Sequence, residues 1–346
     1  MRRGHALEDS LLLAAPTTLR RGSARAGFRT QASPEPLLDE VELTLLDHES
    51  LDWGRIHRAV YLLHQHLHYE YPAPISNLRH RLMIVPPESY GDQRRIRSRL
   101  DVSDTAALVS SHRDCFGNHV VEVRTRKVPQ AIDFASWVLV ERTGGAQRRT
   151  LSGRVLAERF LEPTALTEPD AALVRAARAL AAGSVTRADL AHRINEWVYD
   201  TLEYAPGVTD VQTSAAAALS LGRGVCQDYA HVMLALCRLC GLPARYVSGH
   251  LLGEGGTHAW VEVIIPSPGR PQEALVLALD PTHGRETNLS YLTVAVGRDY
   301  GDVTPTSGTF RGPAPGRLLV RKRLGLAIAE LADFASGGGN GATISA

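Results

Sequence analysis

The chain has few cysteines and almost no net charge. Four of its 346 residues are cysteine (Cys115, Cys226, Cys237 and Cys240), too few for the disulfide framework of a secreted protein of this size. This favours a reducing compartment, and we expect a cytoplasmic localisation. The formal net charge is +1 at pH 7, which argues against a nucleic-acid partner held through phosphate contacts.

Long hydrophobic runs are also missing. The early run 11–15 is too short for a signal-peptide core, and no run approaches the roughly 20 apolar residues that cross a membrane as a helix. We therefore expect no membrane partner. Since 44% of the residues are hydrophobic, the chain can still bury a sizeable core, and its length allows two domains.

Composition changes along the chain predict its organisation. Residues 1–40 mix arginines and prolines without a sustained period, which predicts a disordered leader. Residues 41–160 contain short alternating runs, such as 81–85 and 119–123, that favour an antiparallel β-sandwich-like domain. The glycine-rich stretch within 326–346 predicts a flexible tail.

Between these parts, residues 161–325 begin with a helical pattern. Apolar residues recur at helical spacing over 170–182 and again over 186–202. The second helix is expected to start with a capping box formed by Thr186 and Asp189. Helices followed by strands give an α+β fold class for the whole chain.

Cys226 follows a glycine-rich turn and opens the next helical pattern. Apolar residues recur from Val232 to Cys240, and Gly241 and Pro243 then end the helix. At a helix start, unpaired N–H groups and the positive end of the dipole favour the thiolate, which is the nucleophilic form of cysteine. The alternative is that Cys226 is one more small buried residue, as most free cysteines are.

Two apolar runs further along, 258–265 and 274–279, predict a pair of strands. The proline-rich segment between them is too short for a crossover helix, so we expect an antiparallel hairpin. If that hairpin is symmetric about Gly269, His258 lies directly opposite Asp280, with Cβ atoms about 5 Å apart. The alternatives are a strand histidine with an ordinary structural partner and a carboxylate that only forms a turn.

These motifs resemble one family. Four segments, in this order, are similar to the transglutaminase-like superfamily and in particular to its prokaryotic branch: 224–231, 241–249, 258–262 and 279–282. The stretch 296–305 and short segments between 69 and 118 resemble the same branch more weakly. The resemblance implies a β-rich N-terminal domain followed by a papain-like, transglutaminase-like core of helices packed on an antiparallel sheet.

The resemblance also implies an activity. It suggests a cysteine enzyme in which Cys226 attacks an amide of a peptide or protein substrate, His258 acts as acid and base, and Asp280 orients the histidine. The thioester intermediate would pass to water or to an amine, without a metal or other cofactor. A non-catalytic protein-binding module that retains the fold is the alternative. One departure is His283, which stands where an asparagine is expected.

Two further features give weaker signals. Cys237 and Cys240 form a C-x-x-C pair, but they lie at the end of a helical pattern, so core packing is expected rather than redox or zinc chemistry. Residues 52–141 contain no combination of nucleophile, base and acid. We therefore expect the β-rich domain to shape the substrate site rather than to supply chemistry. The sequence indicates no oligomeric state.

Overall fold

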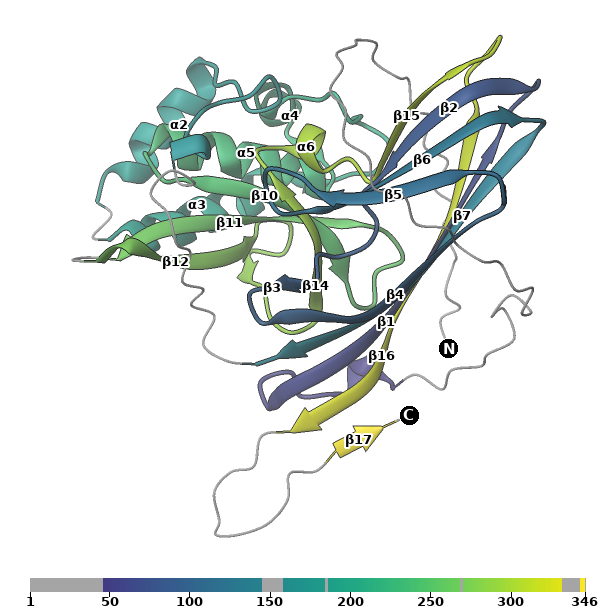
Figure 1. The fold of residues 1–346 in the computed structure, drawn as a ribbon. Coiled ribbons are helices and arrows are strands. Elements are labelled where there is room, and N and C mark those ends of the chain that lie inside the picture. Colours follow the sequence, from purple (N-terminus) through teal and green to yellow (C-terminus); the bar gives the residue numbers. More distant parts are fainter. Residues whose placement is uncertain (1–45, 145–157, 184–185, 268–269, 332–342, 346) are drawn as a thin grey trace, which may run out of the picture.

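A computed structural model describes most of the chain, in the ranges 46–144, 158–183, 186–267, 270–331 and 343–345. The fold is α+β, as expected, with antiparallel sheets and a group of helices at one end (Figure 1). A short 3-10 helix, η2 (His48–Ser50), precedes the first strand. Within these ranges no helix has the length and apolar character needed to cross a membrane.

The β-rich unit contains two antiparallel sheets. The six-stranded sheet consists, in spatial order, of β17 (Thr343–Ser345), β16 (Arg317–Leu331), β1 (Ile56–Glu70), β7 (Ala131–Thr143), β4 (Gln93–Val102) and β3 (Ser89–Tyr90). The four-stranded sheet consists of β15 (Thr306–Arg311), β2 (Ile75–Leu82), β6 (His119–Val128) and β5 (Leu108–Arg113).

The two sheets share one core. Strand β7 alternates between buried and partly buried residues, as a strand does when one face lies in a core. Tyr61 and Phe134 of the larger sheet belong to the same apolar cluster as Leu78 and Val123 of the smaller one. The predicted β-sandwich-like arrangement is therefore present.

Two strands of this unit come from the C-terminal part of the chain. Strand β16 pairs with β1 along its whole length, and β15 pairs with β2. The prediction of a flexible tail beginning at residue 326 is wrong for 326–331, because these residues belong to β16. The strand was missed because it carries many charged residues and its partner lies some 250 residues earlier in the chain. The predicted leader, 1–40, lies outside the described residues.

The remaining residues form a five-stranded sheet covered by helices. The sheet has the order β13 (Arg285–Glu286), β12 (Arg270–Asp280), β11 (His258–Ser267), β10 (Ala244–Leu251) and β14 (Tyr291–Gly297). The helices are α2 (Ala171–Ala181), α3 (Arg187–Thr201), α4 (Ala215–Leu221), α5 (Cys226–Leu239) and α6 (Tyr300–Val303). A two-stranded parallel ladder joins β8 (Glu203–Tyr204) to β9 (Arg223–Gly224).

Helix α5 is the centre of this half of the molecule. Its residues from Gln227 to Arg238 are all buried, and α2, α3 and α4 pack around it. Helix α3 begins with the predicted capping box, in which Thr186 and Asp189 each accept a hydrogen bond from the other's backbone N–H. Gly241 ends α5 with a φ of 67°, in the left-handed region that favours glycine.

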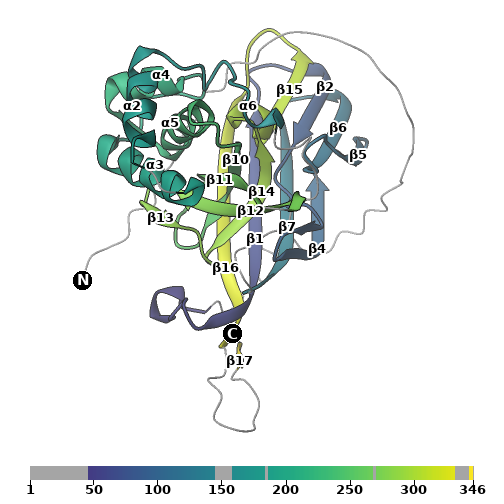
Figure 2. The ribbon, with the colours of Figure 1, turned by 90° about the vertical axis from the view of Figure 1, so that its left-hand side faces the viewer.

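The five-stranded sheet separates the helices from the β-rich unit (Figure 2). Along β11, Val261 and Val263 belong to the apolar core beneath the helices. Trp260, the residue before Val261, points to the opposite face and packs in a cluster with Tyr90 and Phe116 of the β-rich unit. The β-rich unit therefore covers the sheet face opposite the helices.

Side-chain amides of the β-rich unit also cover the outer edge of β14, the last strand of the sheet. The Gln93 amide donates to the carbonyl of Thr293 at 2.8 Å and accepts from its N–H at 2.9 Å. The Asn118 amide makes the same two contacts with Val296, both at 2.8 Å. These amides take the place of a neighbouring strand, so the edge does not present free backbone groups at these positions.

Replacing Asn118 by alanine should destabilise the protein, because two buried backbone groups of Val296 lose their partner. We expect the free energy of unfolding to fall by about 1–3 kcal/mol in urea titrations followed by circular dichroism. Ser111→Ala, on the exposed side of β5, is the control and should change little. Equal stability of the Asn118 variant and the wild type would show that the edge contact does not matter.

Candidate active site

Cys226 is the first residue of α5, as predicted. The turn before it is fixed by the buried carboxylate of Asp228, which accepts the N–H of Val225 at 2.8 Å and the hydroxyl of Thr209 at 2.6 Å. A Cβ on Gly224 would lie 2.5 Å from this carboxylate, so glycine is required there. Asp228 was not identified as a site residue from the sequence, although its position three residues after Val225 is that of a capping carboxylate.

His258 and Asp280 meet as predicted, but the register differs. Nε2 of His258 lies 2.8 Å from Oδ2 of Asp280, and both side chains are almost fully buried. The symmetric hairpin places Val261 opposite Leu277, whereas the structure pairs Val261 with Leu279. The predicted register is therefore wrong by two residues.

The shift arises near the turn of the hairpin. Ser267 pairs with Arg270, but Pro266 pairs with Ala274, so the register of β11 and β12 is irregular between Pro266 and Ser267. A displacement of two residues keeps every side chain on its original face, because side chains alternate along a strand. His258 and Asp280 are thus diagonal neighbours rather than directly opposed, and their long side chains still reach one another.

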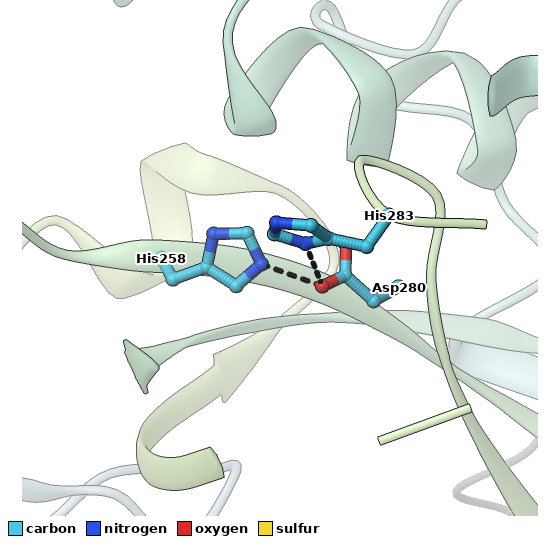
Figure 3. A group of neighbouring side chains, drawn as sticks. All are labelled: His258, Asp280 and His283. Atoms are coloured by element: carbon cyan, nitrogen blue, oxygen red, sulfur yellow. Dashed lines mark hydrogen bonds and ion pairs between the residues drawn. The ribbon is translucent and has the colours of Figure 1, made fainter. Parts of the chain in front are cut away.

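The carboxylate of Asp280 accepts four hydrogen bonds. Oδ2 accepts from His258 and from Nδ1 of His283 at 2.7 Å (Figure 3). Oδ2 also accepts from the hydroxyl of Tyr291 at 2.6 Å, and Oδ1 accepts the N–H of Thr282 at 2.9 Å. Burial alone would raise the pKa of Asp280, but the hydrogen bonds from His258 and His283 hold that pKa well below its usual range. Asp280 is therefore a stable carboxylate.

The imidazole of His258 also hydrogen-bonds to the thiol of Cys226. Since Nε2 faces Asp280, Nδ1 is the nitrogen left for the thiol. Burial lowers the pKa of His258, but the hydrogen bonds to Asp280 and Cys226 outweigh it and raise the pKa to about 10. The stability that the charged ring contributes is complete below the ordinary histidine pKa of about 6.5 and is lost as the pH rises to about 10.

Two residues that the sequence did not assign to the site complete it. Oε2 of Glu254 lies 3.4 Å from Nδ1 of His258, and Oε1 lies 3.5 Å from Nε2 of His283. Glu254 is 39% exposed, so it brings a negative charge to the accessible side of the pair. His283 was noted only as a departure from asparagine, and no sequence signal indicated Glu254.

His258, Asp280 and His283 are also the described cluster with the geometry to hold a metal ion, since one potential ligand atom from each lies within 4.8 Å of the others. Both rings direct a nitrogen at the same oxygen of Asp280, at 2.8 and 2.7 Å. These are hydrogen-bond lengths, so the arrangement fits proton donors that share one carboxylate.

Cys237 of α5 and Cys240, which follows the helix, lie away from the site. Cys237 is fully buried in the core beneath the helices, where burial raises its pKa. The thiol of Cys240, the residue after α5, lies 3.6 Å from the carbonyl of Ala177. The prediction that this C-x-x-C pair serves packing is confirmed.

Comparisons with known proteins identify the family of this chain. The family model of the transglutaminase-like superfamily matches residues 174–281, and that of the bacterial transglutaminase-like N-terminal region matches 61–141. An uncharacterized protein of Mycobacterium leprae is 32% identical over 265 residues, covering 70% of this chain and 90% of its own. The chain belongs to the transglutaminase-like superfamily.

Further proteins are similar to this chain in sequence or in fold. An uncharacterized protein of Mycobacterium bovis is 31% identical over 296 residues, covering 75% of this chain and 89% of its own. A crystal structure of a candidate cysteine protease from Cytophaga hutchinsonii superposes with a TM-score of 0.62 at 21% identity, covering 80% of this chain and 93% of that one. The predicted family and fold class are thus confirmed.

The contact between Cys226 and a charged His258 should make this thiol react unusually fast. At pH 6, we expect iodoacetamide to modify Cys226 at least about tenfold faster than the exposed Cys115, as measured by peptide mass spectrometry. His258→Ala should remove the difference, because the thiol loses the charged ring beside it. Equal rates at the two cysteines of the wild-type protein would contradict the pairing.

The exposed carboxylate of Glu254 should repel anionic reagents. Iodoacetate and iodoacetamide differ in charge but react in the same way, so Glu254→Gln should raise the iodoacetate-to-iodoacetamide rate ratio at Cys226 by about two- to fivefold at low salt. Glu122→Gln, on β6 of the β-rich unit, is the matched control. If the iodoacetate-to-iodoacetamide rate ratio at Cys226 changes equally in both variants, the charge of Glu254 has no specific effect on the thiol.

Proposed function

We propose that this protein is a cysteine enzyme that acts on amide bonds of peptide or protein substrates through a thioester intermediate. One observation carries the proposal: His258 directs one nitrogen at the Asp280 carboxylate, 2.8 Å away, while the ring also hydrogen-bonds to the thiol at the start of α5. Nucleophile, base and orienting carboxylate are thus linked in the order that acyl transfer requires.

The proposed reaction follows from these contacts. The Cys226 thiolate attacks the amide carbon, and the imidazolium of His258 gives a proton to the departing amine. Asp280 keeps the ring in the orientation that presents Nδ1 to the thiol and stabilises its positive charge. In the first turn of a helix the N–H groups have no intrahelical partner, so the N–H of Cys226 can donate to the oxyanion.

The acyl group then passes to water or to an amine. With water as acceptor, His258 removes a proton from the water and returns it to the thiolate as the acid product leaves. With an amine as acceptor, the same steps form a new amide. The proposal covers an amidase or peptidase as well as an acyltransferase, because the three residues serve both reactions equally.

The setting proposed for this activity is the cytoplasm. The four cysteines, all within the described residues, are free thiols, which supports a reducing compartment. The proposed partner is a peptide or protein that carries the reacting amide, and no nucleic acid or membrane partner is proposed.

An electrophilic glutamine mimic tests the proposal directly. The wild-type protein should gain the mass of one probe at Cys226, and Cys226→Ala should lose both labelling and turnover, the latter by about 10⁴-fold or more. Cys115→Ala, which removes an exposed thiol of the β-rich unit, is the control and should retain both.

Two results would contradict the enzymatic proposal. Turnover retained by the folded Cys226→Ala protein would exclude this thiol as the nucleophile. Absence of labelling in a folded wild-type protein would favour the alternative of a binding module that retains the fold without the chemistry.

A further inference from the structure

The hydroxyl of Tyr291 is placed as a dedicated hydrogen-bond donor to Asp280. Tyr291 opens β14, is almost fully buried, and its ring packs edge-on against Trp260 with centroids 5.4 Å apart. Nε of Arg285 donates to the Tyr291 oxygen at 3.0 Å, while that oxygen lies 2.6 Å from Oδ2 of Asp280. Arg285 is itself the donor in its contact and has no acceptor, whereas the Asp280 carboxylate only accepts, so the single proton of the phenol points to Asp280.

This donor remains protonated under all ordinary conditions. Burial and the nearby carboxylate of Asp280 raise the pKa of Tyr291 above its usual value. The hydroxyl is therefore a fixed donor rather than a titrating group, and it binds the same oxygen of the carboxylate, Oδ2, that accepts from His258.

The backbone of Tyr291 is held in turn by the β-rich unit. Arg142, near the end of β7, donates from Nη1 to the carbonyls of Tyr291 and Asn288, the latter at 2.8 Å. Its Nη2 donates to Oδ2 of Asp92 at 2.7 Å, which fixes the plane of the guanidinium. Arg142 is only 8% exposed, and the hydroxyl of Tyr61 on β1 donates to the intervening carbonyl of Leu289.

We propose that Tyr291 and Arg142 are positioning residues of the active site. Tyr291 fixes the Asp280 carboxylate against His258, and Arg142 of the β-rich unit fixes Tyr291. This inference rests on the proposed function, and it gives the β-rich unit a part in setting up the chemistry. From its sequence, that unit is expected to shape only the substrate site.

Loss of the Tyr291 hydrogen bond to Asp280 should lower the reactivity of the Cys226 thiol. If the carboxylate is free to turn toward His283, the hydrogen bond that stabilises the charged form of His258 weakens, and the thiolate loses part of its partner. The loss of one hydrogen bond of about 0.5–1.5 kcal/mol corresponds to a reactivity change of about two- to tenfold.

The test measures alkylation of each cysteine with iodoacetamide as a function of pH in the intact protein. The ratio of the Cys226 rate to the Cys115 rate reports activation of the thiol, and the buried Cys237 reports unfolding, because it reacts only when the core opens. At pH 6, Tyr291→Phe and Arg142→Gln should each lower the ratio about two- to tenfold while Cys237 stays protected.

Three further variants separate positioning from general stability. The double variant should resemble Tyr291→Phe alone, because Arg142 acts through Tyr291. Arg94→Gln is the control; this arginine is 62% exposed, pairs with Glu141 on the neighbouring strand, and should leave the ratio unchanged. Arg142→Lys keeps the charge but lacks the planar fork, so its ratio should fall between wild type and Arg142→Gln.

The outcomes are distinct. A wild-type ratio in Tyr291→Phe, or effects that multiply in the double variant, would overturn the positioning role. If Cys237 becomes reactive in Arg142→Gln, that variant has lost its fold, and Arg142→Lys is used in its place. An unchanged ratio of the Cys226 rate to the Cys115 rate in Arg142→Lys would exclude Arg142 as a positioning residue. A ratio near one in the wild type itself would instead reject the proposed function, whichever way the variants behave.

Discussion

The buried hydrogen bond between His258 and Asp280 is the interaction on which the site depends. Removing an imidazolium and a carboxylate from water is costly, and the contact at 2.8 Å compensates only if the remaining lone pairs of the carboxylate are also occupied. His283, Tyr291 and Thr282 occupy them. With the carboxylate satisfied in this way, burial does not neutralise the pair, and His258 stays charged beside the thiol.

The rest of the fold can be understood as support for this contact. The hairpin of β11 and β12 brings the two side chains to one face, and α5 carries Cys226 to the same place from the helical side. The β-rich unit covers the opposite face of the sheet and binds the edge of β14 through side-chain amides and one buried guanidinium. Tyr291 belongs to β14 as well. It therefore connects the β-rich unit, through Arg142, directly to the carboxylate of Asp280.

The sequence predicted the parts of the site that depend on local order. Cys226 is identified by the glycine turn before it and the helical spacing after it, and His258 and Asp280 by the strands that they begin and end. The register was wrong by two residues because an irregularity at Pro266 has no clear sequence signal. Tyr291, Arg142 and β16 were missed because their roles depend on partners far away in the chain, which no local pattern encodes.

Asp280 holds His258 in its charged form. A pH titration of the protein with ¹⁵N-labelled histidine, followed by NMR of the ring nitrogens, tests this most directly. We expect His258 to titrate near pH 10 in the wild type and Asp280→Asn to move the transition down toward the ordinary value of about 6.5. A wild-type transition already near 6.5, unchanged by Asp280→Asn, would contradict it.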